Sequence, residues 1–247
     1  MRFKEKIVFI TGGISGIGLS AAKNFMSEGA YVILNSRTKA KYEILKPTLI
    51  SISNSFEFIE GDMSKKEDVD KTFEYIKDKF GKIDIVVNSA GISQNRKYNE
   101  ISLEDWYHTI DNNITNTFLV CVKAIELMKV KKYGKIINVS SIAGRNRSKL
   151  AGLHYSMSKS AVITLTKQLA AEVASIGINV NCLAPSQTNT EMLKPFLTPE
   201  NKKMLSETIP LGRVAEPEEQ AKVILFLASE ESSYMVGSIV DVNGGQI

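Results

Sequence analysis

A tyrosine and a lysine lie four residues apart in the segment Tyr155-Ser156-Met157-Ser158-Lys159. On a helix this spacing places both side chains on one face. An ammonium group beside a phenol favours the phenolate and lowers a pKa that normally lies near ~10. The pair therefore predicts a group that transfers a proton to or from a substrate. Because helix surfaces also carry such pairs without a catalytic role, the spacing needs support from other segments.

A glycine-rich segment, Thr11-Gly12-Gly13-Ile14-Ser15-Gly16-Ile17-Gly18, follows a short β-branched run and precedes a stretch with helical periodicity. Glycines at a strand-to-helix turn let the main chain approach a pyrophosphate, whose charge the helix N-terminus stabilises. The spacing differs from the common Gly-x-Gly-x-x-Gly, and a tight turn without a ligand is the alternative. Its place between a strand and a helix favours a dinucleotide-binding turn.

The second β-branched run ends in Asn35-Ser36-Arg37, and the first carboxylate after it is Glu43. NAD-selective sites place a carboxylate at this point, on the ribose 2′-hydroxyl. Arg37 offers instead paired donors and a permanent charge for a 2′-phosphate, with Ser36 beside it. The segment favours NADP, with NAD as the alternative cofactor. A solvated basic helix start is the interpretation without a ligand.

Seven short β-branched runs alternate with helical segments, at residues 6–11, 31–35, 56–60, 83–88, 135–140, 178–184 and 238–242. This alternation predicts a single α/β domain over residues 1–247, a Rossmann-type doubly wound parallel sheet of about seven strands with helices on both faces. The stretch 161–174 is apolar almost all round, as expected for a helix covered on both sides. Ligands of such folds bind beyond the carboxyl ends of the strands.

The chain has 247 residues, 43% hydrophobic and 23% charged, with a formal net charge of +4 spread along its length. This composition is that of an ordinary soluble globular protein and gives no support to nucleic-acid binding. Apolar runs fall short of the ~18 residues of a spanning helix, and the N-terminus does not resemble a signal peptide. Cys121 and Cys182 lie in apolar stretches without a metal-ligand spacing, so we expect buried thiols, no metal and a cytoplasmic location.

Together these segments resemble the short-chain dehydrogenase/reductase family. Asn88-Ser89-Ala90-Gly91 is similar to the family's Asn-Asn-Ala-Gly with one substitution, and Val242-Asn243-Gly244-Gly245 is similar to its closing strand and turn. The motifs stand in the family's order from about residue 6 to residue 245. The resemblance implies an oxidoreductase that interconverts a ketone and a secondary alcohol with NADP(H).

The resemblance implies four catalytic residues: Ser141, Tyr155, Lys159 and Asn113. Tyr155 is expected to donate the proton to the developing alkoxide, while Lys159 holds the nicotinamide ribose and stabilises the phenolate. Ser141 is expected to donate a hydrogen bond to the substrate oxygen. Ser140 is the alternative, because Ser141 lies 14 residues before Tyr155, one more than is usual. Asn113 is expected to fix a water that links Lys159 to solvent.

The implied cofactor-binding residues come mainly from the turns after predicted strands. Asp62 is expected on the adenine, and Thr188 and Thr190 on the carboxamide. Ser186 stands where a glycine is usual, and we expect it to alter the course of the nicotinamide loop. The full set is Gly12, Ser15, Gly16, Ile17, Gly18, Ser36, Arg37, Asp62, Met63, Asn88, Ala90, Gly91, Tyr155, Lys159, Pro185, Thr188 and Thr190.

The substrate is open at this stage, and a loop over about residues 186–215 is expected to cover it. The resemblance is nearest to the 3-oxoacyl-acyl-carrier-protein reductases of fatty-acid biosynthesis. The basic cluster Lys129, Lys131 and Lys132 could meet an acidic acyl carrier protein, although a solvated helix C-terminus also explains it. Ile176 counts against this partner, since such reductases often place a basic residue there.

Other substrates and one other class of function stay open. The basic loop 145–154, with Arg145, Arg147 and Lys149, leaves a sugar, a sugar nucleotide or another anionic small molecule as the alternative substrate. His154 neighbours Tyr155 and could line the pocket, but a structural or solvated role is expected. A non-catalytic cofactor sensor is disfavoured, because it would be expected to have lost a catalytic residue such as Tyr155. Related proteins commonly associate through helices equivalent to 105–131 and 155–175, so we expect a homotetramer.

Overall fold

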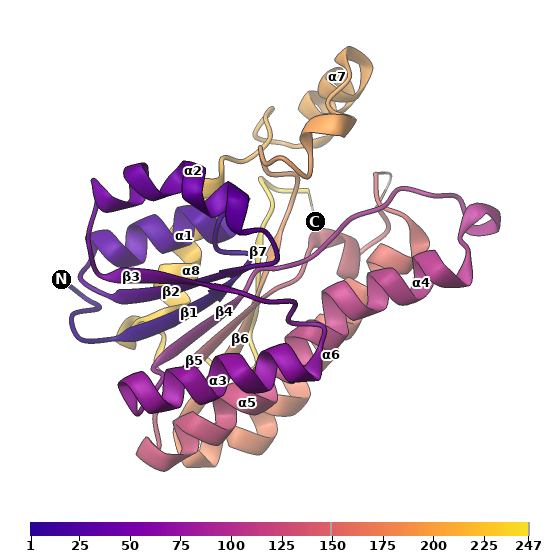
Figure 1. Cartoon of the computed structure of the whole chain (residues 1–247). Coiled ribbons are helices and arrows are strands. Elements are labelled where there is room, and N and C mark those ends of the chain that lie inside the picture. The colour runs from indigo at the N-terminus through magenta and orange to yellow at the C-terminus, as the bar shows by residue number, and fades with distance from the viewer. Residues whose placement is uncertain (149, 247) are drawn as a thin grey trace.

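The computed structural model describes residues 1–148 and 150–246, and its centre is a seven-stranded parallel sheet (Figure 1). The strand order is β3-β2-β1-β4-β5-β6-β7, so the order reverses between β1 and β4. The strands are β1 (Ile7–Thr11), β2 (Tyr31–Ser36), β3 (Phe56–Glu60), β4 (Ile85–Asn88), β5 (Gly134–Val139), β6 (Ile178–Pro185) and β7 (Ile239–Val242). The predicted doubly wound α/β fold is confirmed.

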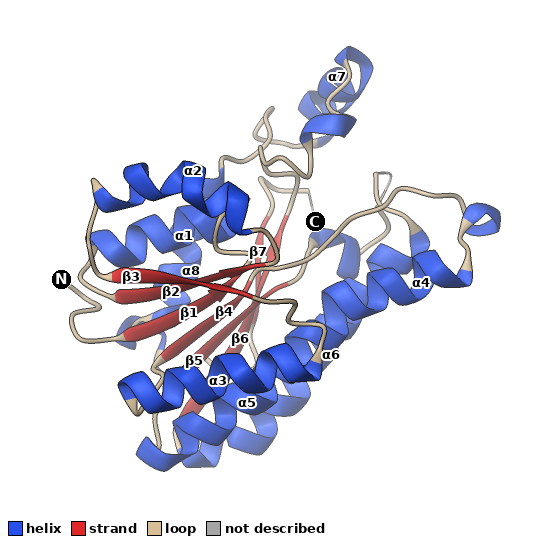
Figure 2. Cartoon of the chain, viewed as in Figure 1, coloured by secondary structure: helices blue, strands red, loops and turns tan. Residues whose placement is uncertain are grey.

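Helices cover both faces of the sheet (Figure 2). Side chains of α1, α2 and α8 pack in an apolar core on one face, and those of α3, α5 and α6 pack in a second core on the other. The helices are α1 (Gly16–Ser27), α2 (Lys39–Ile50), α3 (Lys66–Phe80), α4 (Leu103–Ile110), α5 (Asn116–Lys131), α6 (Leu153–Val173), α7 (Pro199–Thr208) and α8 (Pro217–Ala228).

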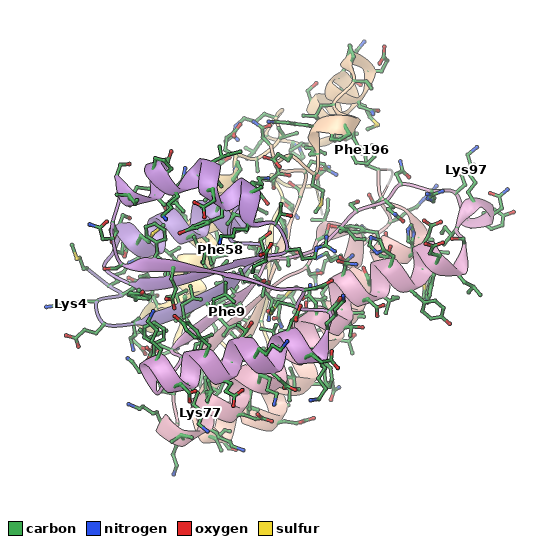
Figure 3. The ribbon with its side chains drawn as sticks, viewed as in Figure 1. Lys4, Phe9, Phe58, Lys77, Lys97 and Phe196 are labelled. Carbon is green, nitrogen blue, oxygen red and sulfur yellow. The ribbon has the colours of Figure 1, made fainter. Side chains whose placement is uncertain are left out.

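Burial on both faces explains why the central strands are continuous apolar runs rather than alternating ones. β1 and β4 are buried along their whole length. Phe9 packs edge-on against Phe73 of α3, with ring centres 5.5 Å apart, whereas Phe58 stacks on Tyr42 of α2 at 4.4 Å (Figure 3). The parallel register places Thr11 beside both Asn35 and Asn88, so the carboxyl ends of β1, β2 and β4 meet at one level.

The structure departs from the prediction at α6. Val162, Thr166 and Ala170 are buried, but Lys167 and Gln168 on the same helix are exposed. Within one chain, therefore, this helix is covered on one side rather than on both. Throughout residues 1–148 and 150–246, every helix is too short or too polar to cross a membrane.

Candidate active site

A cavity of about 350 Å³ opens at the carboxyl edge of the sheet. Its walls come from residues that directly follow β1 to β6, together with the first turns of α1 and α6. Phe196, another wall residue, lies at the base of the projecting α7 segment (Figure 3). This position, around the point where the strand order reverses, is where ligands bind in open α/β sheets.

The turn after β1 provides space that only glycine leaves open. Gly12 and Gly16 have φ angles of 65° and 50°, a region in which other residues are strained. A Cβ atom at Gly18 would lie 2.5 Å from the Gly12 carbonyl oxygen. Gly16 and Ile17 of the first turn of α1 line the cavity, and main-chain N–H groups at a helix N-terminus attract phosphate. The turn thus fits the pyrophosphate of a nicotinamide dinucleotide.

Thr11 connects this turn to the segment after β4. Its hydroxyl accepts hydrogen bonds from the main-chain N–H groups of Ser89 (3.2 Å) and Ala90 (3.1 Å). A Cβ atom at Gly12 would lie only 3.0 Å from the Ala90 Cα. The two segments therefore close against each other where the strand order reverses.

Tyr155 and Lys159 lie in the first two turns of α6, and both line the cavity. The Lys159 Nζ donates to the Val139 carbonyl oxygen at 2.9 Å and lies 5.9 Å from the centre of the Tyr155 ring. Burial lowers the pKa of Lys159 to about 8. Burial also raises the pKa of Tyr155, which the hydrogen bond with the Ser141 hydroxyl offsets only in part. The predicted lowering of the phenol pKa is wrong for this structure, because burial of the phenol outweighs its hydrogen bond with Ser141.

Two serines after β5 have different partners. The Ser141 hydroxyl interacts with Tyr155 and accepts a hydrogen bond from the Ala143 N–H at 3.1 Å. The Ser140 hydroxyl is buried and donates to the Lys159 main-chain carbonyl oxygen at 2.7 Å. The geometry therefore favours Ser141 over Ser140 as the hydroxyl beside a reacting oxygen.

Asn113 lies in a π-helix (Asp111–Thr115) between α4 and α5, a helix type that is frequent at functional sites. Its buried amide donates to the Ile92 carbonyl oxygen (3.0 Å) and the Ser158 hydroxyl (2.9 Å), and accepts from the Ile92 N–H (2.8 Å). A Cβ atom at Gly91 would lie 3.0 Å from the Asn113 Oδ1 and 3.3 Å from the Lys159 Nζ. Both polar groups therefore border the same small space.

Arg37, Asp62 and Asn112 line the cavity near the ends of β2 and β3 and the start of the π-helix. The Arg37 Nη1 donates to the Asn112 Oδ1 at 2.9 Å. Burial acts to raise the pKa of Asp62, but hydrogen bonds from Ser64 and the nearby charge of Arg37 bring it below its ordinary value. Asp62 is therefore ionised at neutral pH and accepts hydrogen bonds.

The loop after β6 accommodates Ser186 without backbone strain. Its φ lies outside the left-handed region, and its N–H donates to the Val242 carbonyl oxygen at 3.1 Å. Thr188 pairs with Ala215 in a parallel bridge. The bonds of that bridge come from the residues that flank Thr188. The N–H and C=O of Thr188 itself take no part in the bridge, and this residue lines the cavity.

Three of the predicted site residues do not line the cavity: Gly18, Asn88 and Asn113. The Asn88 side chain is buried and its Nδ2 donates to the Asn138 Oδ1 at 2.8 Å. Asn88 therefore links β4 to β5 and supports the strands that carry the site, without lining the cavity itself. The residues that do line the cavity are Gly12, Ser15, Gly16, Ile17, Ser36, Arg37, Asp62, Met63, Ala90, Gly91, Ser141, Tyr155, Lys159, Pro185, Thr188 and Thr190.

Asn112 and Asn116 also line the cavity, and neither was predicted from the sequence. The Asn116 Nδ2 donates to the main-chain carbonyl oxygen of Asn112 at 2.6 Å. A signal was available, because Asn112 is the direct neighbour of the predicted Asn113, and Asn116 follows Asn112 by four positions, about one helical turn.

The described arginines of the basic loop before α6 do not supply the cavity with charge. Arg145 pairs with Asp241 of β7 at 2.9 Å, and neither Arg145 nor Arg147 lines the cavity. Lys149 lies outside the described residues. His154 is buried, with its Nε2 3.2 Å from the Gln94 Oε1, and burial lowers its pKa. It is not a cavity residue, in line with the expected structural role.

The cavity thus places a glycine turn that fits a phosphate, the Arg37 and Asp62 side chains and a Ser–Tyr–Lys group along one edge of a doubly wound sheet. This arrangement defines a dinucleotide-binding oxidoreductase site. In residues 1–148 and 150–246 there is no group of three or more side chains of the kind that holds a metal ion.

Comparison with known proteins agrees with this class. The family model described as enoyl-(acyl carrier protein) reductase matches residues 12–246. A 3-oxoacyl-[acyl-carrier-protein] reductase of Aquifex aeolicus is 36% identical over 249 residues, covering 99% of this chain and 98% of that protein. The chain belongs to the short-chain dehydrogenase/reductase family, and it is an oxidoreductase.

Solved structures of this family superpose closely. A 3-oxoacyl-[acyl-carrier protein] reductase from Brucella melitensis is 34% identical with a TM-score of 0.92, covering 100% of this chain and 93% of that one. A gluconate 5-dehydrogenase from Burkholderia cenocepacia, in complex with NADP and tartrate, is 28% identical with a TM-score of 0.93, covering 99% of this chain and 96% of that one. These two relatives act on different substrates, so the fold alone does not identify the substrate.

Proposed function

We propose that this protein is an NADP(H)-dependent reductase that interconverts a ketone and a secondary alcohol. The observation that carries the proposal is the position of Ser141, Tyr155 and Lys159 in the same cavity as the glycine turn and Arg37. A cofactor bound along the carboxyl edge would join these two ends. When bound, it supplies the hydride that reduces the carbonyl carbon.

Each side chain has a role that follows from its surroundings. Tyr155, with its raised pKa, holds its proton at neutral pH and donates it to the developing alkoxide. Ser141 donates a hydrogen bond to the same oxygen, where negative charge grows in the transition state. Lys159 is fixed by Val139 and provides positive charge beside the phenolate that remains. Asn113, whose Oδ1 borders the space next to the Lys159 Nζ, positions a water that returns the proton.

The substrate end of the cavity favours an apolar carbonyl compound. Leu150, Met192, Leu193 and Phe196 line it, and the loop over residues 186–215 that carries three of them is proposed to cover the substrate. Arg145 is held by Asp241, which weakens the case for an anionic sugar. A 3-oxoacyl thioester is therefore the proposed substrate, and a sugar or sugar nucleotide is the alternative.

The same proposal extends to partners and location. An acyl carrier protein would deliver a 3-oxoacyl thioester, and the exposed Lys129, Lys131 and Lys132 offer it positive charge. Assembly as a homotetramer and a place in the cytoplasm, where the buried Cys121 and Cys182 stay reduced, complete the proposal.

NADP preference is the part of the proposal that a single substitution tests most directly. Arg37→Ala should weaken NADPH binding at least tenfold and change NADH binding little, because a charge-assisted hydrogen bond contributes ~1.5–3 kcal/mol. Lys46→Ala is the matched control, since Lys46 is an exposed cation of α2 that does not line the cavity. Both dissociation constants are measured by fluorescence titration. Equal loss for the two cofactors, or a wild-type preference for NADH, would overturn the NADP assignment.

The reaction itself is tested by NADPH oxidation with a panel of carbonyl compounds. A β-ketoacyl thioester should be the best substrate, ahead of keto-sugars, steroid ketones and quinones. Tight NADPH binding with no turnover of any member of the panel would support a cofactor sensor instead. Preference for a keto-sugar would retain the enzyme class and replace the substrate.

A further inference from the structure

Asn112 connects the cofactor's expected 2′-phosphate site to the π-helix. The Arg37 guanidinium, at the end of β2, donates from Nη1 to the Asn112 Oδ1 at 2.9 Å. The two residues are 75 positions apart in the chain, and both line the cavity. Arg37 is otherwise an exposed side chain, so this contact determines where its guanidinium lies.

The orientation of the Asn112 amide is fixed at both ends. Its Nδ2 donates to the His108 carbonyl oxygen at 2.8 Å, so the other end must be the oxygen that accepts from Arg37. The main-chain carbonyl oxygen of Asn112 accepts a hydrogen bond from the Asn116 Nδ2 at 2.6 Å. Asn112 is nine-tenths buried, and its side-chain oxygen is therefore an acceptor held in a fixed orientation toward Arg37.

The acceptor is also neutral, which matters for a site that binds an anion. Arg37 has five N–H donors, and the bond to Asn112 uses one of them. A carboxylate partner would cancel the guanidinium charge, and Asp62 is near enough for Arg37 to influence its pKa. Holding Arg37 on an amide keeps its charge and its remaining donors available for phosphate.

We propose that Asn112 is a positioning residue that pre-orders Arg37 and thereby sets the preference for a 2′-phosphorylated cofactor. The inference rests on the proposed NADP function. Without the Asn112 side chain, the guanidinium is free to move in solvent. The entropy cost of ordering it then falls on phosphate binding and weakens it. Replacing Asn112 by aspartate keeps an acceptor of the same size but places a negative charge beside the phosphate.

The test measures binding rather than turnover. Calorimetry gives the dissociation constants of NADPH, NADH and 2′,5′-ADP for wild type, Asn112→Ala, Asn112→Asp, Arg37→Ala and the double variant Arg37→Ala/Asn112→Ala. Asn112→Ala should weaken NADPH and 2′,5′-ADP about three- to tenfold, in line with loss of one preorganised contact. Asn112→Asp should weaken them further. NADH should stay within twofold for both variants, which also shows that the pocket is intact.

The double variant separates positioning from general support of the fold. If Asn112 acts through Arg37, adding Asn112→Ala to Arg37→Ala should change NADPH binding by less than twofold. Equal weakening of NADH and NADPH by Asn112→Ala, or no change in NADPH while Arg37→Ala loses tenfold, would overturn the inference. No effect of Arg37→Ala on NADPH would instead overturn the proposed NADP function.

Discussion

In the proposed reaction Tyr155 supplies the proton to the developing alkoxide. The Ser140 hydroxyl is bound to the Lys159 main-chain carbonyl oxygen and does not take over this role. Tyr155→Phe should therefore reduce turnover by ~10²–10⁴-fold, the usual contribution of general acid catalysis. NADPH affinity should stay nearly unchanged in a fluorescence titration. Tyr98→Phe, at an exposed tyrosine, is the control. Activity within a factor of about three of wild type would remove Tyr155 from this role.

Lys159 is predicted to cost stability while it serves catalysis. Its pKa of about 8 in the folded state, against an ordinary 10.5, means that burial disfavours the charged form, by about 3 kcal/mol. Lys159→Met removes this cost and loses the hydrogen bond to Val139, worth about 1 kcal/mol. The variant should be inactive but more stable to urea at pH 7, by about 2 kcal/mol.

The pH dependence of that gain follows from the sign of the pKa shift. Between about pH 8 and 10.5 the unfolded chain binds a proton at Lys159 that the folded chain has released, so wild-type stability rises with pH relative to the variant. The advantage of Lys159→Met should therefore be full below pH 8 and fade through this window. A variant less stable than wild type at pH 7, or an advantage that is the same at pH 7 and pH 10, would contradict the assigned burial cost.

The sequence predicted which residues form the site better than it predicted the directions in which their side chains point. Tyr155, Lys159 and Ser141 were recognisable from spacing and family resemblance, and all three line one cavity. The direction of a side chain depends on tertiary partners that spacing does not reveal. Asn88 turns to Asn138, and Asn112 reaches Arg37 across 75 positions of the chain.

Among the elements, the turn after β1 depends on one hydroxyl of β1 itself. The fully buried Thr11 accepts hydrogen bonds from both Ser89 and Ala90. Thr11→Val keeps the shape but leaves two N–H groups without their acceptor, at a cost of about 1–3 kcal/mol in the free energy of unfolding. Thr11→Ser, which retains the oxygen, is the matched control and should lose clearly less. Urea unfolding measures both, and equal losses would show that packing of the threonine methyl, not the hydroxyl, joins these segments.

The strand ranges were predicted closely. β1, β3 and β6 differ from their predicted ranges by no more than one residue at either end, because β-branched runs buried on both faces are distinctive. The π-helix Asp111–Thr115 was not predicted, since its extra residue per turn is stabilised by tertiary contacts such as those of Asn113 with Ile92. Local propensity carries no signal for such contacts.

At the scale of the whole molecule, apolar side chains remain exposed on two helices that contact each other, α4 and α6. Leu103 and Tyr107 of α4 are 72% and 59% exposed, and Leu153 and Met157 of α6 are 53% and 47% exposed. Each pair is four residues apart, so each forms a stripe on its helix. Clustered apolar exposure of this kind usually marks an interface, which agrees with the single-sided burial of α6 in one chain.

We therefore predict that wild-type protein sediments at micromolar concentration as an assembly of four 27.3-kDa chains. Tyr107→Lys places a charge in the proposed interface and should shift the distribution to smaller species, because burying an unpaired charge costs several kcal/mol. Ile44→Lys is the control: Ile44 is 80% exposed on α2, away from α4 and α6, and its substitution should leave the assembly intact. A monomeric wild type would exclude the interface altogether. Dissociation by both variants would show that added charge, rather than the α4 and α6 surface, controls association.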